Sequence, residues 1–239
     1  MRTVTIGRRF NGPPSSGNGG YCCGVTASFL DGPAMVRLKA PPPLETPLTV
    51  ERDGASVRLM DQDKVIATGA PASAPVAAPP LSLSLAAAEA ASGYEDPDAH
   101  YFPSCFVCGP AREEGDGLRI FAGAVDGADA VAAPWTPHRS LAVEDDRIGA
   151  AHVWAALDCP SYFALQKPGL PALLGQMTAA IHRRPDIGEP CIVIGWRLKS
   201  EGRKHLAATA LTSADGETLA IAEALWIELS PEAMAAMKP

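Results

Sequence analysis

Two short segments carry groups that could do chemistry, and they lie far apart in the chain. Asp158 follows the apolar residues 154–157, where burying a carboxylate without a partner would be costly. Asn18-Gly19-Gly20 precedes another apolar segment of helical character. The start of a helix offers free N–H groups and partial positive charge, and glycines let another atom approach the backbone closely. An acid and an oxygen-binding turn are components of acid–base or nucleophilic catalysis.

A second glycine-containing turn competes with the first. Gly149-Ala150-Ala151 opens the apolar segment that leads to Asp158, and His152 follows directly. His152 could point into a cleft, although a packed or surface position is the favoured interpretation. We therefore treat Asn18, Gly149, Ala150, Ala151 and His152 as candidate binding positions.

Asp158 also has a purely structural interpretation. Pro160 lies two residues later, and proline is favoured in the first turn of a helix. Asp158 could therefore cap a segment that begins at Pro160. We favour a functional role for Asp158; in the alternative its carboxylate is a structural cap, of this segment or of another element.

The cysteines predict no metal site. Cys105-Phe106-Val107-Cys108-Gly109 looks like half of a zinc knuckle, but a structural zinc normally has four ligands and no second Cys-x-x-Cys follows. The adjacent pair Cys22-Cys23 has the wrong spacing and lies in an apolar segment. We expect a tight turn with two packed thiols, and no disulfide framework, because no secretory signal is evident.

The elements that must position these residues follow from hydrophobic periodicity. Apolar segments predict helices over 19–30 and 149–166, the second kinked or interrupted at Pro160. Residues 36–39 alternate apolar and basic side chains, which is typical of a half-buried strand. We also predict a short helix over 81–92. The predicted strands cover 3–6, 36–39, 48–51, 56–60, 64–68, 118–124, 128–135, 174–182, 191–199, 204–212 and 218–229.

The predicted elements occur twice in similar order, as an apolar helix followed by a strand series. Met35 and Met177 are 142 positions apart, and Pro47 and Pro190 are 143 apart. We divide the chain into an N-terminal unit 1–70, a linker 71–104 with a short helix, and a C-terminal unit 105–239. Two such units can pair sheet edge to sheet edge, each covering an exposed strand of the other.

Composition excludes several classes of protein. The net charge is -7 and the basic residues form no large cluster, which argues against nucleic-acid binding. No apolar stretch reaches the length of a membrane span, and the N-terminal segment lacks the apolar region of a secretory signal. A cytoplasmic location and no membrane partner are therefore expected.

The order of these segments resembles a double-hotdog protein of the acyl-CoA thioesterase superfamily. Asn18-Gly19-Gly20 is similar to the His-Gly-Gly turn of that family, residues 155–158 to its acid-bearing helix, and residues 221–226 to its final strand. The resemblance implies an α+β fold, a tandem hotdog in which two curved antiparallel sheets each wrap a central helix as an intrachain pseudo-dimer. The family's acid follows its turn by about nine residues, yet Ala27 occupies that position after Asn18, and Gly149 lies nine before Asp158.

Each half thus retains a different part of the family's site. The resemblance implies a thioester hydrolase for acyl-CoA or a related thioester, with Asp158 as base or nucleophile and Gly19-Gly20 as oxyanion turn. The alternatives are a catalytically inactive acyl-CoA or lipid-binding module and, third, an enoyl hydratase or dehydratase. The expected partner is a small acyl thioester, with no cofactor beyond its CoA moiety, and homo-oligomers are common in the family.

Overall fold

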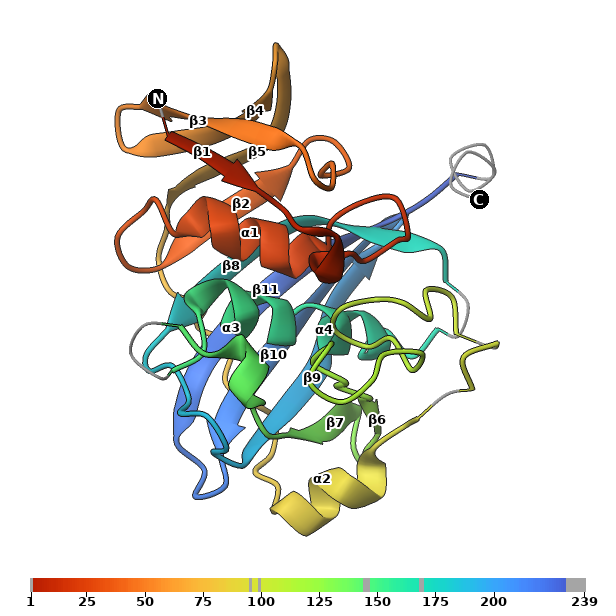
Figure 1. Ribbon diagram of the computed structural model, residues 1–239. Coiled ribbons are helices and arrows are strands. Elements are labelled where there is room, and N and C mark those ends of the chain that lie inside the picture. Colours follow the sequence, from red (N-terminus) through yellow and green to blue (C-terminus); the bar gives the residue numbers. More distant parts are fainter. Residues whose placement is uncertain (1, 95, 99, 144–146, 168–169, 231–239) are drawn as a thin grey trace.

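The computed structural model describes residues 2–230, apart from 95, 99, 144–146 and 168–169. These residues form one antiparallel sheet of eleven strands, in the order β1-β3-β4-β5-β2-β8-β11-β10-β9-β7-β6. The helices α1, α3 and α4 lie together on one face of this sheet (Figure 1). Within the described residues, no helix has the length and apolar character needed to cross a membrane.

The first half follows the predicted order of strand, helix and four strands. Helix α1 ends at Ala27, three residues before the predicted end, and the chain then turns through Gly32, whose φ is +70°. The elements are β1 (Arg2–Thr5), η1 (Arg8–Phe10), α1 (Gly19–Ala27), β2 (Ala34–Leu38), β3 (Pro47–Asp53), β4 (Ser56–Asp61) and β5 (Lys64–Pro71).

The second half repeats this order, but its helix is divided. Pro160 lies in the first turn of the second piece, where its missing N–H costs no hydrogen bond. After α2 (Leu85–Ala91) come β6 (Gly123–Ala124), β7 (Ala130–Trp135), η2 (Arg139–Leu141), α3 (Ala150–Ala156), α4 (Cys159–Phe163), β8 (Ala172–Ile181), β9 (Cys191–Glu201), β10 (Lys204–Ser213) and β11 (Thr218–Glu228).

The strand predicted over 118–124 is wrong except at its last two residues. Leu118 and Ile120 donate their N–H groups to the carbonyls of Phe106 and Val107 at 2.7 and 2.9 Å. This segment therefore bonds to the cysteine-containing loop, and only β6 joins the sheet, against β7. The sequence predicted an extended backbone before the turn at Asp126-Gly127 but could not identify the partner of that backbone.

The two halves share one strand order. It is β1-β3-β4-β5-β2 in the first half and β7-β9-β10-β11-β8 in the second, so the strand directly after the helix is innermost in both. Strands β2 and β8 pair antiparallel, from Ala34 opposite Ala179 to Arg37 opposite Gln176. We expected two sheets; the structure instead has one continuous sheet, because these two edges hydrogen-bond to each other.

Glycines let the two halves' helices approach closely on the face of the sheet. A Cβ atom on Gly24 would lie 2.6 Å from the Cα of Ala151 and 2.8 Å from the Cβ of Trp154. A Cβ on Gly20 would lie 2.8 Å from the Trp154 carbonyl oxygen. The order of these contacts makes α1 and α3 antiparallel, so the end of α3 lies beside the start of α1.

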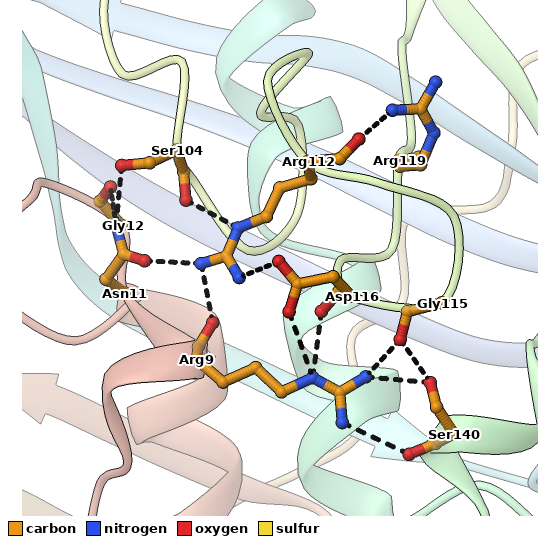
Figure 2. Close-up of polar contacts among 9 residues, drawn as sticks. All are labelled: Arg9, Asn11, Gly12, Ser104, Arg112, Gly115, Asp116, Arg119 and Ser140. Atoms are coloured by element: carbon orange, nitrogen blue, oxygen red, sulfur yellow. Dashed lines mark hydrogen bonds and ion pairs between the residues drawn. The ribbon is translucent and has the colours of Figure 1, made fainter.

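An arginine network fixes the loop of residues 102–120 against the N-terminal segment (Figure 2). The Arg112 side chain is only 9% exposed and donates to the carbonyls of Ser104 and Arg9 and to Oδ1 of Asn11. Its guanidinium also pairs with Asp116 at 2.7 Å. Further contacts are made by Arg9, which donates to Asp116, Gly115 and Ser140, and by Arg119, which donates to Arg112.

Candidate functional site

Asp158 reaches from the second half to the first turn of α1 in the first half. Its backbone occupies the N-cap position of α4, but its side chain makes no capping hydrogen bond there. Instead, Oδ2 accepts hydrogen bonds from Nδ2 of Asn18 at 2.8 Å and from the backbone N–H of Gly20 at 2.9 Å. The carboxylate thus lies at the start of a helix from the other half, where partial positive charge favours an anion.

Asn18 and Gly20 have separate roles in holding this contact. Asn18 caps α1 through its Oδ1, which accepts from the N–H of Tyr21 at 2.9 Å, while its amide nitrogen donates to Asp158. At Gly20, a Cβ would lie 2.5 Å from the Cβ of Asp158, so a glycine is required for this approach. Gly19 instead packs near Leu174, and the contact with Asp158 belongs to Gly20.

Burial dominates the electrostatics of Asp158. The residue is 2% exposed, and burial raises the pKa of its carboxyl to about 7 against the lowering effect of the Gly20 N–H. The charge of Cys105 raises this pKa further, and the Asn18 amide lowers it. Among the described residues, Oδ1 of Asp158 is buried without a hydrogen-bond partner. One carboxylate oxygen is therefore held and the other is unpaired.

The second glycine-containing turn, Gly149 to Ala151, lies apart from Asp158. Gly149 is the N-cap of α3, without a side-chain cap, and Ala150 and Ala151 form the first turn. Ala151 packs against Gly24, one helical turn along α1 from Gly20. The structure therefore groups Asn18 and Gly20 with Asp158, and it places Gly149, Ala150 and Ala151 at the other end of the helix pair.

His152 packs among aromatic rings. Its ring centroid lies 5.7 Å from that of Phe10, 5.6 Å from Tyr21 and 6.0 Å from Phe106. Burial lowers the pKa of His152 to about 4, and the charge of Arg9 adds to this. Within the described part of the chain, its Nδ1 is buried without a hydrogen-bond partner. His152 is therefore a neutral packing residue at ordinary pH, in agreement with the favoured interpretation of its position.

Two supporting residues escaped the sequence analysis. Ser161 donates its hydroxyl to the carbonyl of Asp158 at 2.6 Å and accepts the indole N–H of Trp226 at 2.8 Å. The serine three residues after Asp158 is a local turn signal that could have been noticed. No sequence signal links Trp226 to it, since that contact depends on where β11 passes beneath α4.

The carboxylate is closed off from solvent. Two of the surface hollows in the described part of the chain are lined by Glu201, Gly202, Arg203, Lys204 and Ile227, and by residues of β2, β4 and β5 with Asp53, respectively. Asp158 lines neither of them. Because Asp158 is only 2% exposed, neighbouring side chains or helices must move before an acyl group can reach its carboxylate.

The chain has the hotdog fold. A conserved protein of unknown function with that fold from Alicyclobacillus acidocaldarius matches it with a TM-score of 0.61 and 13% identity, over 96% of this chain and 93% of the other. At such identities the likeness defines the fold, and activity must be argued from the site.

Two further solved structures share this arrangement over nearly their whole length. A proposed thioesterase II from Thermobifida fusca YX has a TM-score of 0.61 and 16% identity, covering 95% of this chain and 92% of its own. A proposed thioesterase from Novosphingobium aromaticivorans has 0.62 and 12%, covering 95% of both chains. No protein-family model and no curated protein sequence matches the chain.

Proposed function

We propose that the chain is a thioesterase-like hydrolase that acts on an acyl-CoA or a related thioester. The observation that carries this proposal is the contact of the Asp158 carboxylate with Asn18 and Gly20 at the start of α1. An acid and a helix N-terminus from opposite halves are thereby assembled at one place. Proteins of the same fold that are named as proposed thioesterases support the choice of reaction.

Asp158 and the first turn of α1 would have different roles in the reaction. Asp158 would accept a proton from water as the water oxygen bonds to the acyl carbon, or its carboxylate would attack that carbon directly. The N–H of Gly20, with Gly19 beside it, would then bind the carbonyl oxygen as negative charge develops there. In the first route the carbon–sulfur bond breaks, Asp158 returns its proton to the leaving thiolate, and the carboxylic acid remains. In the second route the thiolate leaves and the acyl group stays on Asp158 as an anhydride, which water then hydrolyses to the carboxylic acid, the free Asp158 carboxylate and the proton that the thiolate takes up.

An internal duplication would produce two sites, and loss of the acid in the first half would leave one. The shared strand order of the two halves supports a duplicated unit, and the second glycine turn, Gly149 to Ala151, packs against a helix with Ala27 at the matching acid position. We therefore propose one reactive centre between the halves. It would need no cofactor other than the CoA moiety of its substrate.

One observation favours an inactive acyl-CoA or lipid-binding module as the second candidate. Asp158 is 2% exposed, and its bonded oxygen already occupies the N–H that a substrate oxygen would require. If the helices never separate, this contact holds the halves together and performs no chemistry.

Hydrolysis of a panel of acyl-CoA chain lengths by wild type and Asp158→Asn separates these functions. Loss of a general base predicts a fall in kcat of at least about 100-fold. Asp129→Asn is the matched control, because Asp129 is 60% exposed and pairs with Arg197 on the surface. Turnover that survives Asp158→Asn would remove the assigned role. Absence of turnover in wild type, with acyl-CoA binding retained, would establish the binding module.

A further inference from the structure

Three buried thiols from distant parts of the chain converge beside the candidate site. Cys105 and Cys108 belong to the loop of residues 102–120, and Cys159 begins α4 directly after Asp158. Their residues are 3%, 6% and 8% exposed. The three sulfur atoms lie within 4.8 Å of one another, and those of Cys105 and Cys159 are 3.8 Å apart.

These separations suit a tetrahedral metal ion. Zinc binds thiolate sulfur at about 2.3 Å, so two sulfurs on one tetrahedral zinc lie roughly 3.8 Å apart. A disulfide would need sulfurs at about 2.05 Å. The Cys105–Cys159 distance already has the value for two ligands of one ion, and Cys108 would move by less than about 1 Å to complete the set.

The loop itself is shaped like a metal-binding knuckle. The backbone N–H groups of Val107 and Cys108 both donate hydrogen bonds to the sulfur of Cys105. Gly109 closes the turn by donating its N–H to the Cys105 carbonyl at 2.9 Å. A Cβ on Gly109 would lie 2.4 Å from that carbonyl oxygen and 2.5 Å from the Pro103 oxygen, so only glycine fits.

The two pieces that supply the thiols are held in place independently. Arg112 ties the loop to the N-terminal segment through Ser104, Arg9 and Asn11 (Figure 2). Cys159 is fixed by the start of α4, where the Ser161 hydroxyl bonds to the Asp158 carbonyl. Ligands on well-anchored backbone bind a metal without a large ordering cost.

We propose that Cys105, Cys108 and Cys159 bind one zinc ion as thiolates, with a water molecule as the fourth ligand. Within the described residues, no other His, Cys, Asp or Glu has a ligand atom that joins this group. The zinc ties the loop of residues 102–120 to α4. The sequence motif Cys-x-x-Cys alone did not predict a metal site, because the third thiol, Cys159, comes from α4 and lies 51 residues after Cys108.

Metal analysis of the intact purified protein tests this site. Wild type grown with zinc and purified without chelators should contain about one zinc per chain, and Cys108→Ser and Cys159→Ser should each lose most of it. Cys191→Ser is the matched control, because Cys191 is equally buried but lies outside the group at the start of β9. This control should retain the wild-type zinc content.

Cobalt substitution of wild type provides a readout that needs no variant. One equivalent of Co²⁺ should produce intense thiolate-to-cobalt charge-transfer absorption and the visible bands of tetrahedral cobalt, and added zinc should abolish both. The proposal is overturned if reduced wild type neither contains zinc nor takes up zinc or cobalt. It is also overturned if folded Cys159→Ser keeps a full equivalent of zinc, or if the freshly purified chain carries a Cys105–Cys159 disulfide.

Discussion

Gly24→Ala should destabilise the protein although alanine is the better helix former. In an isolated helix, this change would stabilise by up to about 1 kcal/mol. Here the new Cβ would lie 2.6 Å from the Cα of Ala151 and 2.8 Å from the Cβ of Trp154. The Ala151 Cα is backbone and cannot rotate away, so α1 and α3 must separate.

The net change in the free energy of unfolding is the cost of overpacking minus the gain in helix propensity. Overpacking of this kind costs typically 1–3 kcal/mol, and two contacts below 3.0 Å place Gly24→Ala near the upper end. Subtracting the helix-propensity gain leaves a net loss of about 2 kcal/mol. For a chain of this size, that loss lowers Tm by roughly 4–8 °C.

Thermal and urea unfolding measure this loss, with Gly7→Ala as the control. A Cβ on Gly7 would meet its nearest neighbours at 3.8 Å, an ordinary contact, and its φ of −66° suits alanine. Gly7→Ala should therefore stay within about 0.5 kcal/mol of wild type. If Gly24→Ala is as stable as wild type while the control behaves as expected, α1 and α3 are not in the close contact described.

Two other substitutions test the surroundings of the site. His152 has its pKa lowered to about 4 in the fold, so the stability it contributes is complete above pH 6.5 and is lost as the pH falls from 6.5 towards 4. Glutamine does not titrate, so His152→Gln should reduce the acid-induced loss of stability by up to about 3 kcal/mol. Urea unfolding at several pH values measures this loss, and an unchanged pH dependence would contradict a buried, neutral His152. Arg112→Lys should lower stability by about 2–3 kcal/mol and speed proteolysis within residues 102–120, because lysine cannot reproduce the donors to Ser104, Arg9 and Asn11. The surface control Arg197→Lys should do neither, and equal behaviour of the two variants would show that the network does not hold the loop.

The sequence contained enough information to place most strands and both principal helices. Alternation in residues 36–39 located β2, and the apolar segments gave α1 and the α3–α4 region. Pro160 correctly indicated a break in the second helix, because a proline without an N–H fits only a first turn. The prediction of a strand over 118–124 was wrong because an extended backbone can hydrogen-bond to a loop as well as to a sheet.

Parts of the candidate site were beyond sequence reasoning. Asp158 stood out as a carboxylate in an apolar helix, but its choice of Gly20 over Gly19 depends on the angle at which α3 crosses α1. The approach of Cys159 to Cys105 likewise depends on how the loop folds back over α4. Long-range contacts of this kind are set by tertiary packing and leave no local pattern in the chain.

The seam between β2 and β8 makes the two halves a single cooperative unit. Unfolding either half would remove one of the two strands paired with the other half's inner strand, and unfolding the second half would also expose the face of α1 that contains Gly20 and Gly24. Neither half can then fluctuate far on its own while the other keeps a native structure. A destabilising change anywhere in one half is therefore transmitted to Asn18 and Asp158 together, however distant it is from them.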